Sequence, residues 1–261
     1  MTAIRATARH GATQGLGATE RRDPWWIQPG IIAAGFGAFI AYSLFSALIW
    51  EPLFGVGYEV DGYLSPFFSP LIFEGSLPWW FSPAILILWI PLGFRTTCYY
   101  YRKAYYRSYF ADPPACAVGE PSIHRRYAME RGFPFILQNI HRYFLYLAFV
   151  PLFFLWVDGL YSFVNTGPRL GLGSLILLGN AALLSGYSLS CHSLRHLAGG
   201  RLDCFSCSAA ARVRYRAWQR LTGLNEHHML WAWVSLVSVA FADLYVRLLA
   251  AGFIVDPAIR L

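Results

Sequence analysis

Residues 172–192 read LGSLILLGNAALLSGYSLSCH, and this stretch decides the fold class. It contains no Asp, Glu, Lys or Arg, and its length suits a bilayer, because a helix of about 20 residues spans the hydrocarbon core. In lipid the backbone must satisfy its own hydrogen bonds, so such a run forms a helix. The stretch also ends on Cys191 and His192, two side chains that bind metals. We therefore expect a membrane-spanning helix with a chemically active end.

Four similar runs lie elsewhere in the 261-residue chain, of which 56% is hydrophobic and only 13% charged. A soluble domain carries about 25% charged residues. The composition excludes a disordered chain, disfavours a water-soluble globule and predicts an all-α, polytopic transmembrane bundle of five helices. The expected spans are Ile31–Trp50, Pro83–Tyr101, Tyr143–Phe163, Leu172–His192 and Met229–Phe253. We expect a cytoplasmic tail over 1–29, the five-helix domain over 30–255 and a short external tail over 256–261. The N-terminus lacks an apolar segment, so no cleaved signal peptide is expected.

The basic residues set the orientation of this bundle. Eighteen of the 21 Lys and Arg residues fall in the N-terminal segment or in the links between spans two and three and between spans four and five. The opposite loop, Glu51–Ser82, has none and carries four acids. By the positive-inside rule the N-terminus is cytoplasmic and the C-terminus lies outside, in a multi-pass protein of the plasma membrane. We expect the aromatic segment Ser65–Pro83 to lie along the outer interface as a collar.

Histidine and cysteine side chains gather on one side of this membrane. All seven histidines and all five cysteines fall on the cytoplasmic side or in the cytoplasmic ends of the spans. Spans two to five each bring a thiol or an imidazole to a common level, from Cys98, His141, Cys191, His192, His196 and His228. Thiolates with imidazoles form a ligand set for zinc or for an iron–sulfur cluster. The gathering of donors predicts a bound cofactor better than any one motif does.

Two other cofactor hypotheses use the same donors. A single b-type haem needs two imidazoles from different helices, which His141 or His228 could supply with His192 or His196. A zinc-binding transporter or structural membrane protein is the second. Broken helices and inverted repeats, which are typical of transporters, are not visible in the sequence.

Two further features have both a plain and a functional interpretation. Cys204 and Cys207 form a C-x-x-C that is either a metal-binding pair or a reduced pair of thiols. Asp243 lies four residues before Arg247, which predicts an intrahelical ion pair, whereas an intramembrane carboxylate by itself suggests function.

Four stretches carry a resemblance to a known family. They are TCYYYRKAYYR at 97–107, PPACAV at 113–118, QNIHRY at 138–143 and SCHSLRH at 190–196. Together they resemble the fused, SdhC-type membrane-anchor subunit of actinobacterial respiratory complex II, the mycobacterial type with a membrane-embedded Rieske-type cluster. The likeness runs from the first span to the C-terminus.

This resemblance implies a succinate:quinone oxidoreductase in which a flavoprotein subunit and an iron–sulfur subunit dock on the anchor, which is not catalytic alone. The anchor would hold a [2Fe–2S] cluster through two cysteines and two histidines and pass electrons to quinone. The candidate ligands are Cys98, Cys116, Cys191, His141, His192, His196 and His228. The expected quinone-binding residues are Tyr99, Arg102 and Arg195. Which two cysteines and which two histidines bind the cluster stays open at this point, and nucleic acid is not an expected partner.

Overall fold

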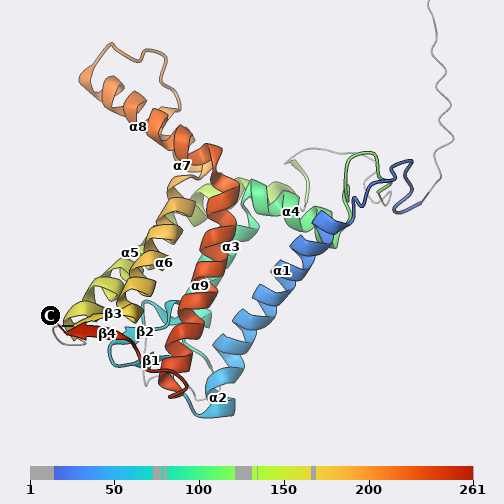
Figure 1. Ribbon diagram of the computed structural model, residues 1–261. Coiled ribbons are helices and arrows are strands. Elements are labelled where there is room, and N and C mark those ends of the chain that lie inside the picture. Colours follow the sequence, from blue (N-terminus) through green and yellow to red (C-terminus); the bar gives the residue numbers. More distant parts are fainter. Residues whose placement is uncertain are drawn as a thin grey trace, which may run out of the picture.

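The computed structural model describes residues 15–72, 78, 81–120, 131–133, 135–165 and 169–260. His10, His124 and part of the expected aromatic collar lie outside this range. Figure 1 shows a bundle of helices that run roughly alongside one another, with shorter elements at both ends. The all-α membrane bundle expected from the sequence is confirmed.

Four helical segments are long and apolar enough to cross a membrane, at Ile27–Phe54, Ile136–Val164, Leu172–Leu189 and His228–Ala250. The first comprises α1 (Ile27–Leu44), the π-helix η1 (Phe45–Ile49) and α2 (Trp50–Phe54). The others contain η4 (Phe135–Ile140) with α5 (His141–Asn165), then α6 (Leu172–Leu189), and α9 (His228–Ala250). Large apolar side chains such as Phe153 and Val237 are exposed on these helices, as lipid-facing residues are.

The expected second span, Pro83–Tyr101, differs from the prediction. Helix α3 covers only Ile85–Thr96, and after an extended residue the chain continues in a new helix, α4 (Tyr99–Tyr109). Twelve residues rise about 18 Å, well short of a bilayer core. Helix α4 reads YYYRKAYYRSY, and its charges belong at the membrane surface, where Figure 1 shows it turning away from the bundle. A fifth full span is therefore not confirmed.

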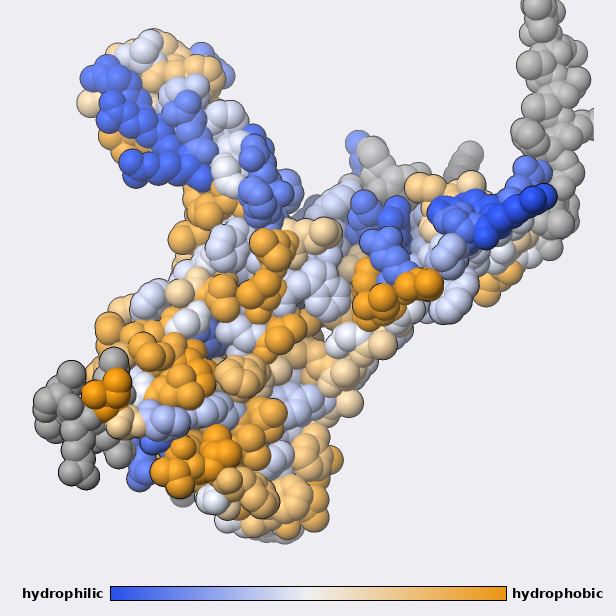
Figure 2. Space-filling view, viewed as in Figure 1, coloured by the Kyte–Doolittle hydropathy of each residue, from blue (hydrophilic) through white to orange (hydrophobic). Residues whose placement is uncertain are grey.

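The cytoplasmic link between α6 and α9 is also helical. It contains α7 (His192–Gly199) and α8 (Ala209–Glu226), and Figure 1 shows α8 projecting beyond the end of the bundle. Figure 2 shows hydrophilic residues on α8 and near α4, whereas hydrophobic residues cover the bundle below them. This separation is consistent with the orientation predicted from charge.

The opposite end of the bundle is closed by short elements. Strands β1 (Glu59–Val60) and β2 (Tyr63–Leu64) form a hairpin, and β3 (Arg169–Gly171) pairs with β4 (Ala258–Arg260) in antiparallel register. The segment expected as a short external tail contains β4, and its Asp256 accepts a hydrogen bond from Tyr63 at 2.6 Å.

The predicted aromatic collar is partly wrong. The 3₁₀-helix η2 (Pro66–Phe68) places Phe67 and Phe68 inside the bundle, where they pack with Ala47 and Ala84. These rings are 3% and 1% exposed, so they are core residues and not interfacial anchors.

A buried charge network fastens this outer end to α9. The Asp243 carboxylate accepts hydrogen bonds from Tyr42 and Ser46, each at 2.5 Å, and from Ser65. Arg247 lies 3.7 Å from Asp243 and donates to the carbonyl of Ser46 at 2.8 Å. The predicted intrahelical ion pair is present, and its hydrogen bonds extend to α1, η1 and the loop before η2.

Replacing Asp243 with Ala should destabilise the assembled protein by about 3–5 kcal/mol, because the Arg247 charge would be left buried without a partner. Thermal unfolding of the purified complex in detergent measures the change. The double variant D243A/R247M should recover much of the loss. A single variant as stable as wild type would show that the network does not hold this end together.

Candidate metal centre

Two breaks between helices shape the centre of the cytoplasmic end. Cys98 separates α3 from α4, and Cys191 separates α6 from α7. Both have extended backbones, with φ and ψ of −66° and 133° for Cys98 and −63° and 135° for Cys191. Each cysteine is the N-cap of the helix that follows, and the Cys191 sulfur accepts a hydrogen bond from the Ser193 amide at 3.4 Å. A helix N-terminus favours negative charge, which suits a thiolate.

Each of the two thiols faces one imidazole from another helix. The Cys98 sulfur lies 3.4 Å from Nε2 of His228, the first residue of α9. The Cys191 sulfur lies 3.2 Å from Nε2 of His141, the first residue of α5. The pairs therefore join four separate elements. Cys98 and Cys191 are 2% and 1% exposed and belong to the main buried core of the bundle.

A hydroxyl fixes the other nitrogen of each imidazole. Thr97 Oγ1 donates to the Gly93 carbonyl at 2.7 Å, so it accepts from Nδ1–H of His141 at 2.9 Å. Ser190 Oγ likewise donates to the Tyr187 carbonyl at 3.0 Å and accepts from Nδ1–H of His228 at 2.7 Å. The two Nε2 atoms that face the sulfurs are then unprotonated. Metal-binding histidines are commonly oriented in this way by a partner on the second nitrogen.

The dipeptides Thr97–Cys98 and Ser190–Cys191 make equivalent contacts. Thr97 bonds His141 while Cys98 faces His228. Ser190 bonds His228 while Cys191 faces His141. Sequence reasoning did not single out Thr97 or Ser190. A Ser or Thr directly before a cysteine at both helix breaks is the signal that could have found them.

Aromatic rings hold both imidazoles in place. Phe94 stacks on His141 with ring centroids 4.9 Å apart, and Tyr187 stacks on His228 at 5.2 Å. The Tyr187 hydroxyl is buried beside the Cys98 thiol and has no hydrogen-bond partner of ordinary geometry among the described residues. A hydroxyl in this position is free to donate to a sulfur of a bound cluster, and such bonds tune cluster potentials.

Arg95 brings a cation close to the centre. Its guanidinium donates to Tyr101, to the Ala232 carbonyl at 3.2 Å and to Ser235 at 3.1 Å. It also lies over the Tyr187 ring, 4.7 Å from the centroid. No carboxylate in the described part of the chain pairs with it.

The four donors fit a two-iron cluster better than a single ion. Among the described residues, no three His, Cys, Asp or Glu side chains converge as one metal ion would require. A Rieske-type [2Fe–2S] group would need two cysteines on one iron and two histidines on the other. The donor set here has that composition, with both Nε2 atoms unprotonated. Burial raises the pKa of the Cys191 thiol to about 11, so metal binding there would release a proton.

The other predicted ligands lie outside this group of four. His192 is exposed, with its ring centroid 6.0 Å from that of His228, and His196 is exposed beside Arg142. Cys116 is exposed beyond the far end of α4, where its carbonyl accepts from Arg21 at 2.8 Å. Cys204 and Cys207 are joined by a disulfide. The structure thus brings together four of the seven candidates.

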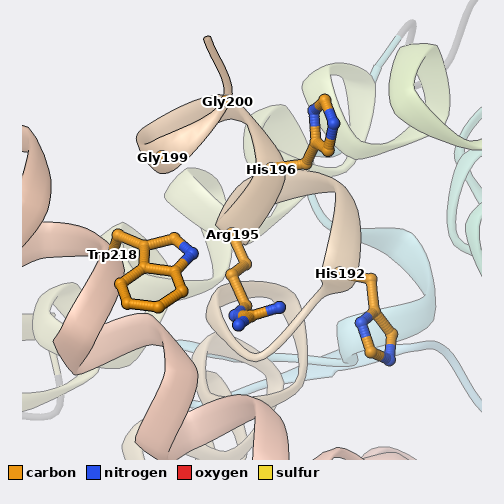
Figure 3. Close-up of a pocket in the computed structure, with 6 residues that line it drawn as sticks. All are labelled: His192, Arg195, His196, Gly199, Gly200 and Trp218. Carbon is orange, nitrogen blue, oxygen red and sulfur yellow. The ribbon is translucent and has the colours of Figure 1, made fainter. Parts of the chain in front are cut away.

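The predicted quinone-binding residues occupy two places. The Arg102 guanidinium lies over the ring of Tyr99, 4.0 Å from its centroid, at the start of α4. Arg195 belongs to a cavity of about 290 Å³ between α7 and α8, lined by His192, Arg195, His196, Gly199, Gly200 and Trp218. Figure 3 shows the Arg195 and Trp218 side chains next to each other, and Arg195 also donates to Thr222 at 2.9 Å.

Two comparisons with known proteins found matches for this chain. The family model described as "Actinobacterial succinate dehydrogenase subunit SdhC" matches residues 27–252. Among solved structures, the chain is similar to one from the "Mycobacterium smegmatis Sdh1 complex in the apo form". The two are 41% identical with a TM-score of 0.81, over 93% of this chain and 94% of that one. The comparison with curated proteins found no match.

Replacing Thr97 with Val should lower metal retention about tenfold under a chelator challenge, because His141 loses the acceptor that orients its ring. Elemental analysis of the purified complex measures iron and zinc. Thr96→Val is the matched control, since the Thr96 hydroxyl bonds only carbonyls of its own helix. Equal retention in both variants would contradict the positioning role of Thr97.

Proposed function

The chain belongs to the family of actinobacterial succinate dehydrogenase SdhC subunits, and on that premise we propose that it carries electrons through a Rieske-type [2Fe–2S] cluster to quinone. As a member it is a multi-pass plasma-membrane subunit of succinate dehydrogenase that is not catalytic alone. Membership also implies partner subunits. The cluster, its ligands and the quinone site are the parts that we propose.

The observation that carries the proposal is the pairing of two thiols with two unprotonated imidazoles at one level. We assign Cys98, Cys191, His141 and His228 as ligands. When bound there, a Rieske-type cluster would supply one-electron transfer at about −150 to +300 mV, well above the roughly −400 mV of plant-type ferredoxins. That range suits delivery of electrons to a quinone.

The b-type haem alternative is less well supported. A bis-histidine haem needs two imidazoles that point at one iron from opposite sides. Here each Nε2 atom of His141 and His228 faces a cysteine sulfur. His192 and His196, the other predicted haem ligands, are exposed side chains of α7.

Several residues of this chain support electron transfer without binding metal. Arg95 adds positive charge beside Cys98. Charges attract strongly in a medium of low dielectric constant, so the reduced, more negative form of the centre is favoured. The N-termini of α4 and α7 act in the same direction. Tyr99, Arg102 and Arg195 stay proposed quinone-binding residues, with Tyr99 and Arg102 at the start of α4 and Arg195 at the separate cavity between α7 and α8.

The proposed docking site of the partner subunits is the end of the bundle that carries α4, α7 and α8, next to the candidate metal centre. Figure 1 shows α8 on one side and α4 with the N-terminal segment on the other, and the helix breaks lie between them. Arg212, Arg216 and Arg220 recur every fourth residue on the exposed face of α8. An iron–sulfur subunit seated there would come close to Cys98 and Cys191, and its contact surface for α8 would be acidic.

The variants His141→Ala and His228→Ala should abolish quinone reduction by the intact complex and leave succinate oxidation by a soluble dye unchanged. Each removes a proposed iron ligand, whereas the dye takes electrons before they reach this subunit. His227→Ala is the control and should retain quinone reduction, because the exposed His227 side chain lies outside the four proposed ligands and the proposed quinone-binding residues. Normal quinone reduction in either of the first two variants would refute the ligand assignment, and zinc without iron in the wild-type complex would refute the cluster.

Reversing the charge of Arg212, Arg216 and Arg220 to Glu should reduce the partner subunits that co-purify with this chain, because like charges would then face each other across the docking surface. Replacing the same three with Lys keeps the charge and should preserve assembly, although more weakly at high salt, since charge pairing is screened. Full assembly of the Glu variant at low salt, where repulsion is strongest, would place the docking surface elsewhere.

A further inference from the structure

A narrow apolar groove of about 350 Å³ runs along the outside of the bundle between α1 and α9. It is lined by Gly35, Ala38, Phe39, Tyr42, Trp233, Leu236, Val237, Ala240, Phe241 and Leu244. Small residues on both helices leave the space, and a Cβ atom on Gly35 would already lie 3.5 Å from the Trp233 ring. The volume is in the range of small-ligand sites, which are mostly apolar with a few polar groups.

The groove lies within the membrane-spanning segments. From Trp233 to Leu244 it follows α9 for about 16 Å, at 1.5 Å per residue. The two polar side chains of its lining are already engaged, since Tyr42 donates to Asp243 and Trp233 donates to Tyr100 at 2.7 Å. An occupant of most of its length therefore meets an apolar surface, which suits a hydrocarbon chain.

The cytoplasmic end of the groove reaches the candidate metal centre. Trp233 stacks on Phe36 with ring centroids 4.7 Å apart, and Phe36 in turn contacts the ring of Tyr101 at 5.5 Å. Tyr101 donates to the Ala232 carbonyl at 2.6 Å and lies one helical turn after Cys98. A ligand head at this end would lie within a few side chains of the proposed cluster.

Helix α4 closes the same end against the cytoplasm. Its first turn is tied to α9 by the bond between Tyr100 and Trp233, and its last residue, Tyr109, donates to the Ala33 carbonyl of α1 at 2.7 Å. An occupant with a polar head beneath α4 and a long apolar tail would place its head beside Tyr100 and Trp233 and its tail along the groove.

The lining of the groove is almost entirely apolar, so it suits a chain of carbon atoms along its length.

We propose that this groove binds the isoprenoid tail of the quinone, with the ring lying under α4 near Tyr100 and Trp233. The proposal rests on the proposed quinone reduction and adds the path by which the substrate is held and enters from lipid. It assigns Gly35, Ala38 and Ala240 as the small residues that leave room for the tail.

The test compares two quinones in the intact complex, one with a tail of several isoprene units and one without a tail. The variant Ala38→Phe fills the groove and should raise KM for the long-tailed quinone about tenfold or more, since room for a single methylene in an apolar pocket is worth at least about that factor. KM and kcat for the tailless quinone should stay within about twofold, as for a surface change. Ala41→Phe, at an exposed α1 residue outside the groove lining, should alter neither.

Three other results of this test would each overturn part of the proposal. Equal effects of Ala38→Phe on both quinones, or no effect on either, would overturn the tail site while leaving quinone reduction in place. A phospholipid that co-purifies with wild type and is absent from Ala38→Phe, with no change in KM, would assign the groove to an acyl chain. Failure of the wild-type complex to reduce either quinone would instead overturn the proposed function.

Discussion

The structure depends on two hydrogen-bonded chains that cross between helix breaks, from Thr97 through His141 to Cys191 and from Ser190 through His228 to Cys98. Each chain joins elements far apart in sequence by groups that would be costly to bury alone. Both breaks place an extended cysteine at the N-terminus of a surface helix, so the same local turn ends the apolar helix, positions a thiol and starts the cytoplasmic layer. A bound cluster would use both chains at once and so couple metal binding to folding of the cytoplasmic end.

Polar groups within the bundle gather at two levels. At the cytoplasmic end the hydroxyls of Thr97 and Ser190 orient two imidazoles toward two thiols. At the outer end, Asp243 and Arg247 bond to their neighbours and join the loops to α9.

The sequence predicted the class, the side of the membrane that holds the chemistry and most of the span positions, because these depend on apolar run length and on charge. It failed where tertiary packing decides. The expected second span runs to Tyr101 because the tyrosines at 99–101 count as apolar in a run, but the helix ends at Thr96 and these tyrosines belong to α4. Phe67 and Phe68 pack in the core and not along the interface. For the site, spacing along the chain could place the donors at one level but not choose among them. The choice of ligands depends on which face of each helix points into the bundle. His141 and His228 point inward, whereas His192 and His196 are exposed.

Pulsed EPR of the reduced, intact complex from cells grown on ¹⁵N-labelled histidine tests the central claim most directly. The assignment of His141 and His228 as iron ligands predicts a [2Fe–2S] signal with couplings to two histidine nitrogens, and the loss of one coupling or of the whole signal when either residue is replaced. A reduced complex without a histidine-coupled iron signal, or one whose only additional centre is a haem, would contradict the account.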